Sequence, residues 1–189
     1  MSKILAIAGS TRGESLNRKL LAVAAQAVLA SGADVTVLDL REYPMPIYEG
    51  DLEAREGIPA NARKLKAIFR EHQGLLIASP EYNASVSPLL KNTLDWVSRQ
   101  DGGQNGLVPY QGKVAALFAA SQGVYGGLRG LMHIRAILQN LGVLVLNEQY
   151  ALGRAHEAFT AEAKLNDPRA QASVDGIAQR LVQVIEKLN

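Results

Sequence analysis

Residues 4–17 read ILAIAGSTRGESLN, and this stretch decides the fold of the chain. Its first five residues, Ile4 to Ala8, form a short apolar run that predicts a buried β-strand. Gly9 ends that run, and apolar residues then return from Leu16 onward at the three- and four-residue spacing of an amphipathic helix. The stretch therefore predicts a strand, a tight turn and the beginning of a helix.

The same alternation of apolar runs and helical patterns continues along the chain. Further strands are predicted at residues 35–38, 74–79, 114–120 and 143–146. Helices are predicted at residues 16–28, 59–72, 88–98, 126–141 and 174–188, with an irregular surface loop at 40–58 and a Gly-rich loop at 101–111. The strands are continuously apolar, which is typical of a parallel sheet covered by helices on both faces. We expect one α/β domain over residues 1–189, a doubly wound three-layer sandwich whose strand order the periodicity leaves open.

Composition and charge exclude several classes of protein. A chain of 189 residues, 48% of them hydrophobic, can bury a core without a disulfide or a structural metal. The net charge of +2, with no basic block, gives no indication of nucleic-acid binding. No apolar run approaches the ~20 residues of a membrane span. The chain has no cysteine, and its first apolar run is too short for a signal peptide, so we expect a cytoplasmic protein with no membrane partner.

The turn after the first strand is dense in groups that bind anions. It offers hydroxyls, an amide and a fixed cation from Ser10, Thr11, Ser15, Asn17 and Arg12. The following helix N-terminus adds free N–H groups and about half a positive charge, so the turn predicts a phosphate site. Neither G-x-x-x-x-G-K-[ST] nor G-x-G-x-x-G is present, which favours a single terminal phosphate; the alternative is a simple helix cap. Without those glycines, Asp39 after the second strand is not expected to bind a ribose.

Two later turns carry weaker signals of the same kind. Tyr82 and Asn83, after the third strand, offer a flat ring and a mixed donor and acceptor, which suit a planar heteroaromatic ligand. The glycines between Ser121 and Arg129 permit close approach of the backbone to a ligand. Each turn alone is equally well explained as an ordinary loop and helix entry. The sequence identifies no acid–base pair and no metal-ligand spacing, so we expect no catalytic side chain and no metal, but a cofactor that carries the reactive atom.

Taken together, the three turns resemble the NADPH-dependent FMN reductase family, a flavodoxin-like group. The matching motifs are G-S-x-R-x-x-S-x-N at residues 9–17, P-E-Y-N-x-S at 80–85 and S-x-G-x-x-G-G-x-R at 121–129. The resemblance implies a five-stranded parallel sheet of order 2-1-3-4-5. It implies FMN with its phosphate on Ser10, Arg12, Ser15, the Leu16 backbone and Asn17. It also implies a flavin ring against Pro80, Glu81, Tyr82 and Asn83, with Ser121 and Gly123 nearby.

The resemblance implies an activity and an assembly as well. NADPH or NADH would transfer hydride to the flavin in a ping-pong reaction. The flavin would then reduce a small-molecule acceptor such as a quinone, an azo compound, a metal oxyanion or free flavin. The family forms homodimers or homotetramers. Two other classes stay open: an electron-transfer flavoprotein without its own substrate, which the +2 charge disfavours, and a flavin-free regulator. The family usually has Pro-Gly where this chain has Ser87-Pro88, so we expect a slightly shifted helix start there.

Overall fold

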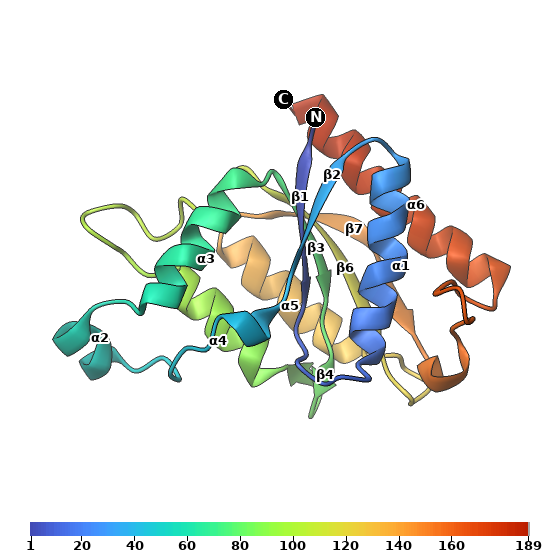
Figure 1. The fold of residues 1–189 in the computed structure, drawn as a ribbon, viewed down its shortest axis with the longest axis horizontal. Helices are drawn as coiled ribbons and strands as arrows, with labels where there is room; N and C mark the ends of the chain where they lie inside the picture. The colour runs from blue at the N-terminus through green and yellow to red at the C-terminus, as the bar shows by residue number, and fades with distance from the viewer. Residues whose placement is uncertain (189) are drawn as a thin grey trace.

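The computed structural model describes residues 1–188 and shows a parallel sheet between two layers of helices (Figure 1). The order of its five strands is β2-β1-β3-β6-β7, and every neighbouring pair is parallel. The strands are β1 (Lys3–Ala8), β2 (Asp34–Leu38), β3 (Gly74–Ala78), β6 (Val114–Ala120) and β7 (Leu144–Leu152). This order confirms the expected 2-1-3-4-5, because β6 and β7 are the fourth and fifth strands of the sheet along the chain.

The two helical layers follow from the alternation of side chains along each strand. Ile4 and Ala6 pack with α1 (Leu16–Ala30) and α6 (Pro168–Leu188). Leu5 and Ile7 point to the opposite face and pack with the other three long helices. These are α3 (Ala60–Glu71), α4 (Pro88–Val97) and α5 (Leu128–Asn140). The central strands are therefore buried on both faces, which accounts for their continuously apolar sequences.

The edge strand β2 departs from the expectation of burial on both faces. Val37 is 65% exposed, and Thr36 beside it is also exposed. The strand pairs with β1 alone, so its outer side has no strand to cover it. A continuously apolar sequence indicates a strand but does not tell a central strand from an edge strand.

The excursion between β2 and α3 is more ordered than the predicted irregular loop. It contains the 3₁₀ helix η1 (Leu40–Glu42) and the short helix α2 (Gly50–Glu56). Glu49 caps α2 by accepting the N–H groups of Asp51 and Leu52, a local device that leaves no periodic signal. Trp96 is buried and holds the excursion in place by donating from Nε1 to the carbonyl of Pro46 at 2.7 Å.

Three further elements differ from their predicted bounds. Strand β7 continues past residue 146 to Leu152, beyond a register shift opposite Ala115 and Leu117. The antiparallel hairpin β4 (Glu81–Tyr82) and β5 (Ser85–Val86) was not predicted, because two-residue strands have no periodicity to detect. Helix α6 begins at Pro168, ahead of the predicted residue 174. Within residues 1–188, none of the helices is both long enough and apolar enough to cross a membrane.

A buried lysine directly precedes β6. It lies at the opposite end of the strand from the turn that carries the third motif. Lys113 is 5% exposed, and its Nζ donates to the backbone carbonyl of His72. Burial lowers the pKa of Lys113 to about 8, because the charged ammonium loses its hydration. In the unfolded chain the same group titrates near ~10.4. The unfolded chain therefore binds more protons than the folded chain between these two pH values, and stability rises with pH across that window.

We expect Lys113→Met to remove this pH dependence. The free energy of unfolding of the wild type, relative to the variant, should increase between about pH 8 and about pH 10.4. Urea unfolding of both chains near pH 7.5, below the window, and near pH 9.5, inside it, measures the difference. The exposed Lys187→Met is the matched control and should show no such change. A wild-type advantage that is constant with pH would contradict the assignment.

Candidate functional site

The turns after β1, β3 and β6 lie together beyond the carboxyl ends of these strands (lower edge of Figure 1). A cleft of about 530 Å³ lies among them. Parallel α/β sheets bind ligands at this edge. Most of the predicted site residues line the cleft together: Ser10, Arg12, Ser15, Leu16, Asn17, Pro80, Glu81, Tyr82 and Ser121. Asn83 and Gly123 belong to the same loops but stand outside its lining.

The first turn presents unpaired donors to the cleft. Ser15 caps α1, and its Oγ accepts the N–H of Arg18 at 3.3 Å. Within the described part of the chain, nothing accepts a hydrogen bond from the backbone N–H of Leu16 or of Asn17, and Arg12 is exposed and forms no ion pair. A helix N-terminus with free N–H groups and an unpaired guanidinium is suited to an anion.

Asn17 holds this turn in place. Its amide oxygen accepts the N–H of Ala120 at 2.9 Å, and its amide nitrogen donates to the Ala120 carbonyl at 2.9 Å. Both bonds are buried, and they fasten the first turn of α1 to the last residue of β6. The Asn17 side chain therefore positions the site, and it keeps its backbone N–H and a second amide hydrogen for a ligand.

The turns after β1 and β3 are also joined directly. Ser87 caps α4, with its Oγ accepting the N–H of Leu90 at 3.2 Å and donating to the carbonyl of Gly9 at 2.7 Å. A Cβ at Gly9 would lie 3.1 Å from both Leu90 and Pro80, so only glycine fits without displacing these side chains. Helix α4 begins at Pro88, where the sequence predicted it to begin.

The hairpin after β3 carries the aromatic side of the cleft. Asn83 and Ala84 both have positive φ values, 49° and 66°, so the two-residue connection between β4 and β5 is a tight turn of the kind that matches strand twist. Asn tolerates this conformation, whereas it strains Ala. The turn leaves Tyr82 about half exposed at the rim of the cleft.

Glu81 links the hairpin to the first turn of α5. Its Oε1 accepts from Arg129 Nε at 2.9 Å, and its Oε2 accepts from the backbone N–H of Gly130 at 3.1 Å. Burial alone would raise the pKa of Glu81, but the hydrogen bonds from Gly130 and Arg129 outweigh burial and hold that pKa below its ordinary value. The carboxylate is ionised and committed to these partners, so a ligand in the cleft meets Glu81 through its backbone.

Several residues that line the cleft were not predicted from the sequence. Among them, His156 lies furthest along the chain from the three motifs. It sits on η2 (Ala155–Glu157), which follows β7, and its Nε2 lies 3.0 Å from Oε1 of Glu157. The other missed lining residues are Glu14, Lys19, Ala120 and Gln122. No motif marks His156, but strand order alone predicts that the end of β7 shares an edge with the end of β6. Among residues 1–188, no cluster of three or more His, Asp or Glu is placed to hold a metal.

Comparisons with known proteins identify the family of this chain. The model of a family described as NADPH-dependent FMN reductase matches residues 2–157. The NAD(P)H-dependent FMN reductase PA1204 of Pseudomonas aeruginosa is 33% identical over 187 residues, which cover 98% of this chain and 96% of the relative. The quinone reductase of Escherichia coli K12 is 33% identical over 154 residues, 80% of this chain and 77% of that protein. The structure of FerB, a flavoenzyme NAD(P)H:(acceptor) oxidoreductase from Paracoccus denitrificans, superposes with a TM-score of 0.83 at 28% identity, covering 99% and 98% of the two chains.

We expect Asn17→Ala to destabilise the chain by about 2–4 kcal/mol, because it leaves the N–H and carbonyl of Ala120 buried without partners. Urea unfolding measures the loss. Asn140→Ala is the matched control, since Asn140 is exposed on a helix and its side chain bonds to no described residue. A loss for Asn17→Ala no greater than for the control would show that the Asn17 side chain does not hold the turn.

Proposed function

The chain belongs to the NADPH-dependent FMN reductase family, and from that premise we propose that its cleft holds FMN for the NAD(P)H-dependent reduction of quinones. The observation that carries the proposal is the convergence of three turns on one cleft. One end of the cleft offers an unpaired cation and free N–H groups, and another offers a half-exposed aromatic ring. This arrangement suits a ligand with a phosphate at one end and a flat ring at the other.

The residues of the first turn fit a phosphate monoester. We propose that Arg12, the hydroxyls of Ser10 and Ser15 and the N–H groups of Leu16 and Asn17 hold it. A phosphate carries about −1.5 to −2 charges at neutral pH, and an arginine can meet it with two parallel hydrogen bonds. The unpaired state of these donors in the described chain supports the assignment, because groups with structural partners would not be free to bind.

The hairpin and the glycine loop fit the remainder of the cofactor. We propose that the ring lies against the backbone and side chains of the hairpin turn, with the glycine loop beside it. The residues are Pro80, Glu81, Tyr82, Asn83, Ser121 and Gly123. The bonds of Glu81 to Arg129 and Gly130 fix the hairpin to the first turn of α5, which follows the glycine loop, so the cleft is shaped before a ligand arrives.

FMN, when bound, would supply the hydride-accepting chemistry, and the protein would supply binding and orientation. We propose that donor and acceptor use the same open side of the cleft in turn, which is a ping-pong scheme. The donor would be NADPH or NADH. Azo compounds, metal oxyanions and free flavin would be acceptors besides quinones, because a half-exposed rim at Tyr82 leaves the approach to the cleft accessible.

We also propose a homodimer or homotetramer. Several large apolar side chains are exposed on the loop before α5 and on the first turns of that helix: Val124, Tyr125, Leu128 and Met132. Contiguous exposed apolar surface of this kind marks interaction sites. The loop borders the cleft, so a second copy packed there would lie beside the flavin.

Arg12→Ala should weaken FMN binding about 10- to 100-fold, because the charge-assisted contact of this exposed arginine with the phosphate, about 1.5–3 kcal/mol in total, is lost. Equilibrium dialysis with FMN gives the dissociation constants, and urea unfolding checks that the fold is retained. The matched control is Arg55→Ala, an exposed arginine on α2 outside the cleft. If Arg12→Ala binds FMN as tightly as the control, the phosphate lies elsewhere.

The proposed activity has a direct spectroscopic test. Adding NADPH to the FMN-loaded protein without oxygen should bleach the visible absorption of the flavin, and a quinone added next should restore it. Steady-state rates measured over both substrates should give the parallel double-reciprocal lines of a ping-pong scheme. Flavin that binds but is not bleached by NADPH or by NADH would instead favour an electron carrier without a substrate of its own.

A further inference from the structure

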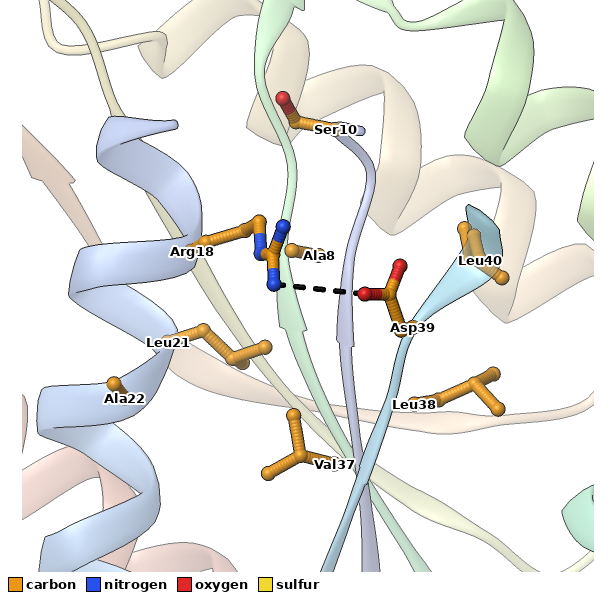
Figure 2. A pocket seen from close by; sticks show the side chains of 9 residues that line it. All are labelled: Ala8, Ser10, Arg18, Leu21, Ala22, Val37, Leu38, Asp39 and Leu40. Carbon is orange, nitrogen blue, oxygen red and sulfur yellow. Dashed lines mark ion pairs between the residues drawn. The ribbon is translucent and has the colours of Figure 1, made fainter. Parts of the chain in front are cut away.

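A second cavity of about 190 Å³ lies beside the cleft, between α1 and the carboxyl end of β2 (Figure 2). Its walls are mainly apolar and come from Ala8, Leu21, Ala22, Val37, Leu38 and Leu40. Arg18 and Asp39 face each other across it, with Nη2 and Oδ2 3.5 Å apart (Figure 2). Ser10 lines both this cavity and the cleft, so the two sites adjoin at the turn after β1.

The size and lining of the cavity suit one sugar ring of a nucleotide. Sites for drug-sized ligands occupy roughly 300–1,000 Å³, so this cavity takes a smaller group. A carboxylate accepts hydrogen bonds from sugar hydroxyls, and a guanidinium binds phosphate. The apolar walls at Leu21 and Val37 would pack against the sugar and the near edge of a base, and they account for the exposure of Val37 on an edge strand.

The Asp39 carboxylate is ionised, and it can exchange a hydrogen bond from Arg41 for one from a ligand. The hydrogen bond from the Arg41 side chain is the main reason that the pKa of Asp39 falls to about 2, so its carboxylate is ionised at neutral pH. Arg41 is half exposed, and an ion pair in contact with water contributes little to stability. A sugar hydroxyl can therefore replace one of the Arg41 hydrogen bonds at small cost.

The order of the strands decides which nucleotide fits. Along the edge of the sheet, the hairpin follows β3, the phosphate turn follows β1, and the small cavity follows β2, and these strands are neighbours in that order. A ligand that spans this edge would place a ring at the hairpin, phosphates at the phosphate turn and a sugar at the small cavity. A flavin dinucleotide has its groups in this order. On the basis of the proposed function, we infer that the cavity takes the adenosine ribose of FAD, so that the chain binds FAD as well as FMN through the same turn.

Because the G-x-G-x-x-G motif is absent, the sequence predicted no ribose at Asp39, and the inference departs from that prediction because Asp39 lines a cavity that adjoins the phosphate turn at Ser10. That motif brings backbone N–H groups to a pyrophosphate. Here two guanidinium groups take that role, because Arg12 lines the cleft and Arg18 lines the cavity on either side of Ser10. The adenosine half of NADPH fits the cavity less well than that of FAD. With the nicotinamide over the flavin ring, NADPH would have to cross the turn after β1, where the phosphate of the bound cofactor lies.

Ala22→Phe is the variant that tests the inference. Ala22 is exposed on α1 and lines the cavity, so a phenyl ring there blocks the cavity without entering the core. Equilibrium dialysis of the flavin-free full-length chain with FAD and with FMN gives both affinities. The variant should bind FAD at least about tenfold more weakly than the wild type, and FMN within about twofold of it. Gln26→Phe, an exposed position on the same helix outside the cavity, is the control and should change neither affinity.

Three results would overturn the inference. In the first, the wild type binds FMN but does not bind FAD. In the second, FAD binds the wild type and Ala22→Phe equally well, because its adenosine stays in solvent. In the third, Ala22→Phe loses FMN as well as FAD while Gln26→Phe keeps both, so that the cavity does not act apart from the cleft. Failure of the wild type to bind FMN at all is a different result, and it would overturn the proposed function as well.

Discussion

The two hydrogen bonds between Asn17 and Ala120 are the constraint on which the site depends. They join residues 103 positions apart, and they are buried where the first helix and the fourth strand of the sheet come together. A turn at the surface would otherwise be free to move, because its own backbone groups face solvent or a ligand. With Asn17 fastened, the N–H groups of α1 keep a fixed direction, and electrostatic recognition of an anion requires such preorganised donors.

Glu81 performs the same task on the other side of the cleft. Its carboxylate holds Arg129 and Gly130, and the close approach of Gly130, where a Cβ would lie 3.3 Å from the Glu81 Cβ, brings the hairpin and the first turn of α5 together. Ser87 adds a third such link through Gly9. The side chains of Asn17, Glu81 and Ser87 thus form their hydrogen bonds within the protein. Free backbone donors, the Ser10 and Ser15 hydroxyls, Arg12 and the Tyr82 ring remain for a ligand, and this division explains how an open cleft keeps its shape.

The sequence predicted the parts of this structure that depend on local pattern. Apolar runs located the five main strands, and helical spacing of apolar residues located the five long helices. Strand order came from the resemblance of the three motifs, since periodicity does not encode which strands are neighbours. Contacts over long separations were beyond reach. The two bonds from the Asn17 side chain to Ala120 were not predicted, because nothing near Asn17 in the sequence points to Ala120, and the sequence did not single out His156 because its helix carries no motif.

The open edge of the sheet is where local pattern and global position diverge most. Val37 reads as a core residue, yet β2 has a single neighbouring strand, and no other element of the described chain buries this side chain. An apolar side chain that stays exposed to water gains none of the free energy that its burial would provide. A ring bound between Leu21 and Val37 would bury that surface and engage Arg18 and Asp39 at once. The cavity therefore has a physical use that the fold alone does not supply, and its shared wall at Ser10 connects that use to the anion site of the first turn.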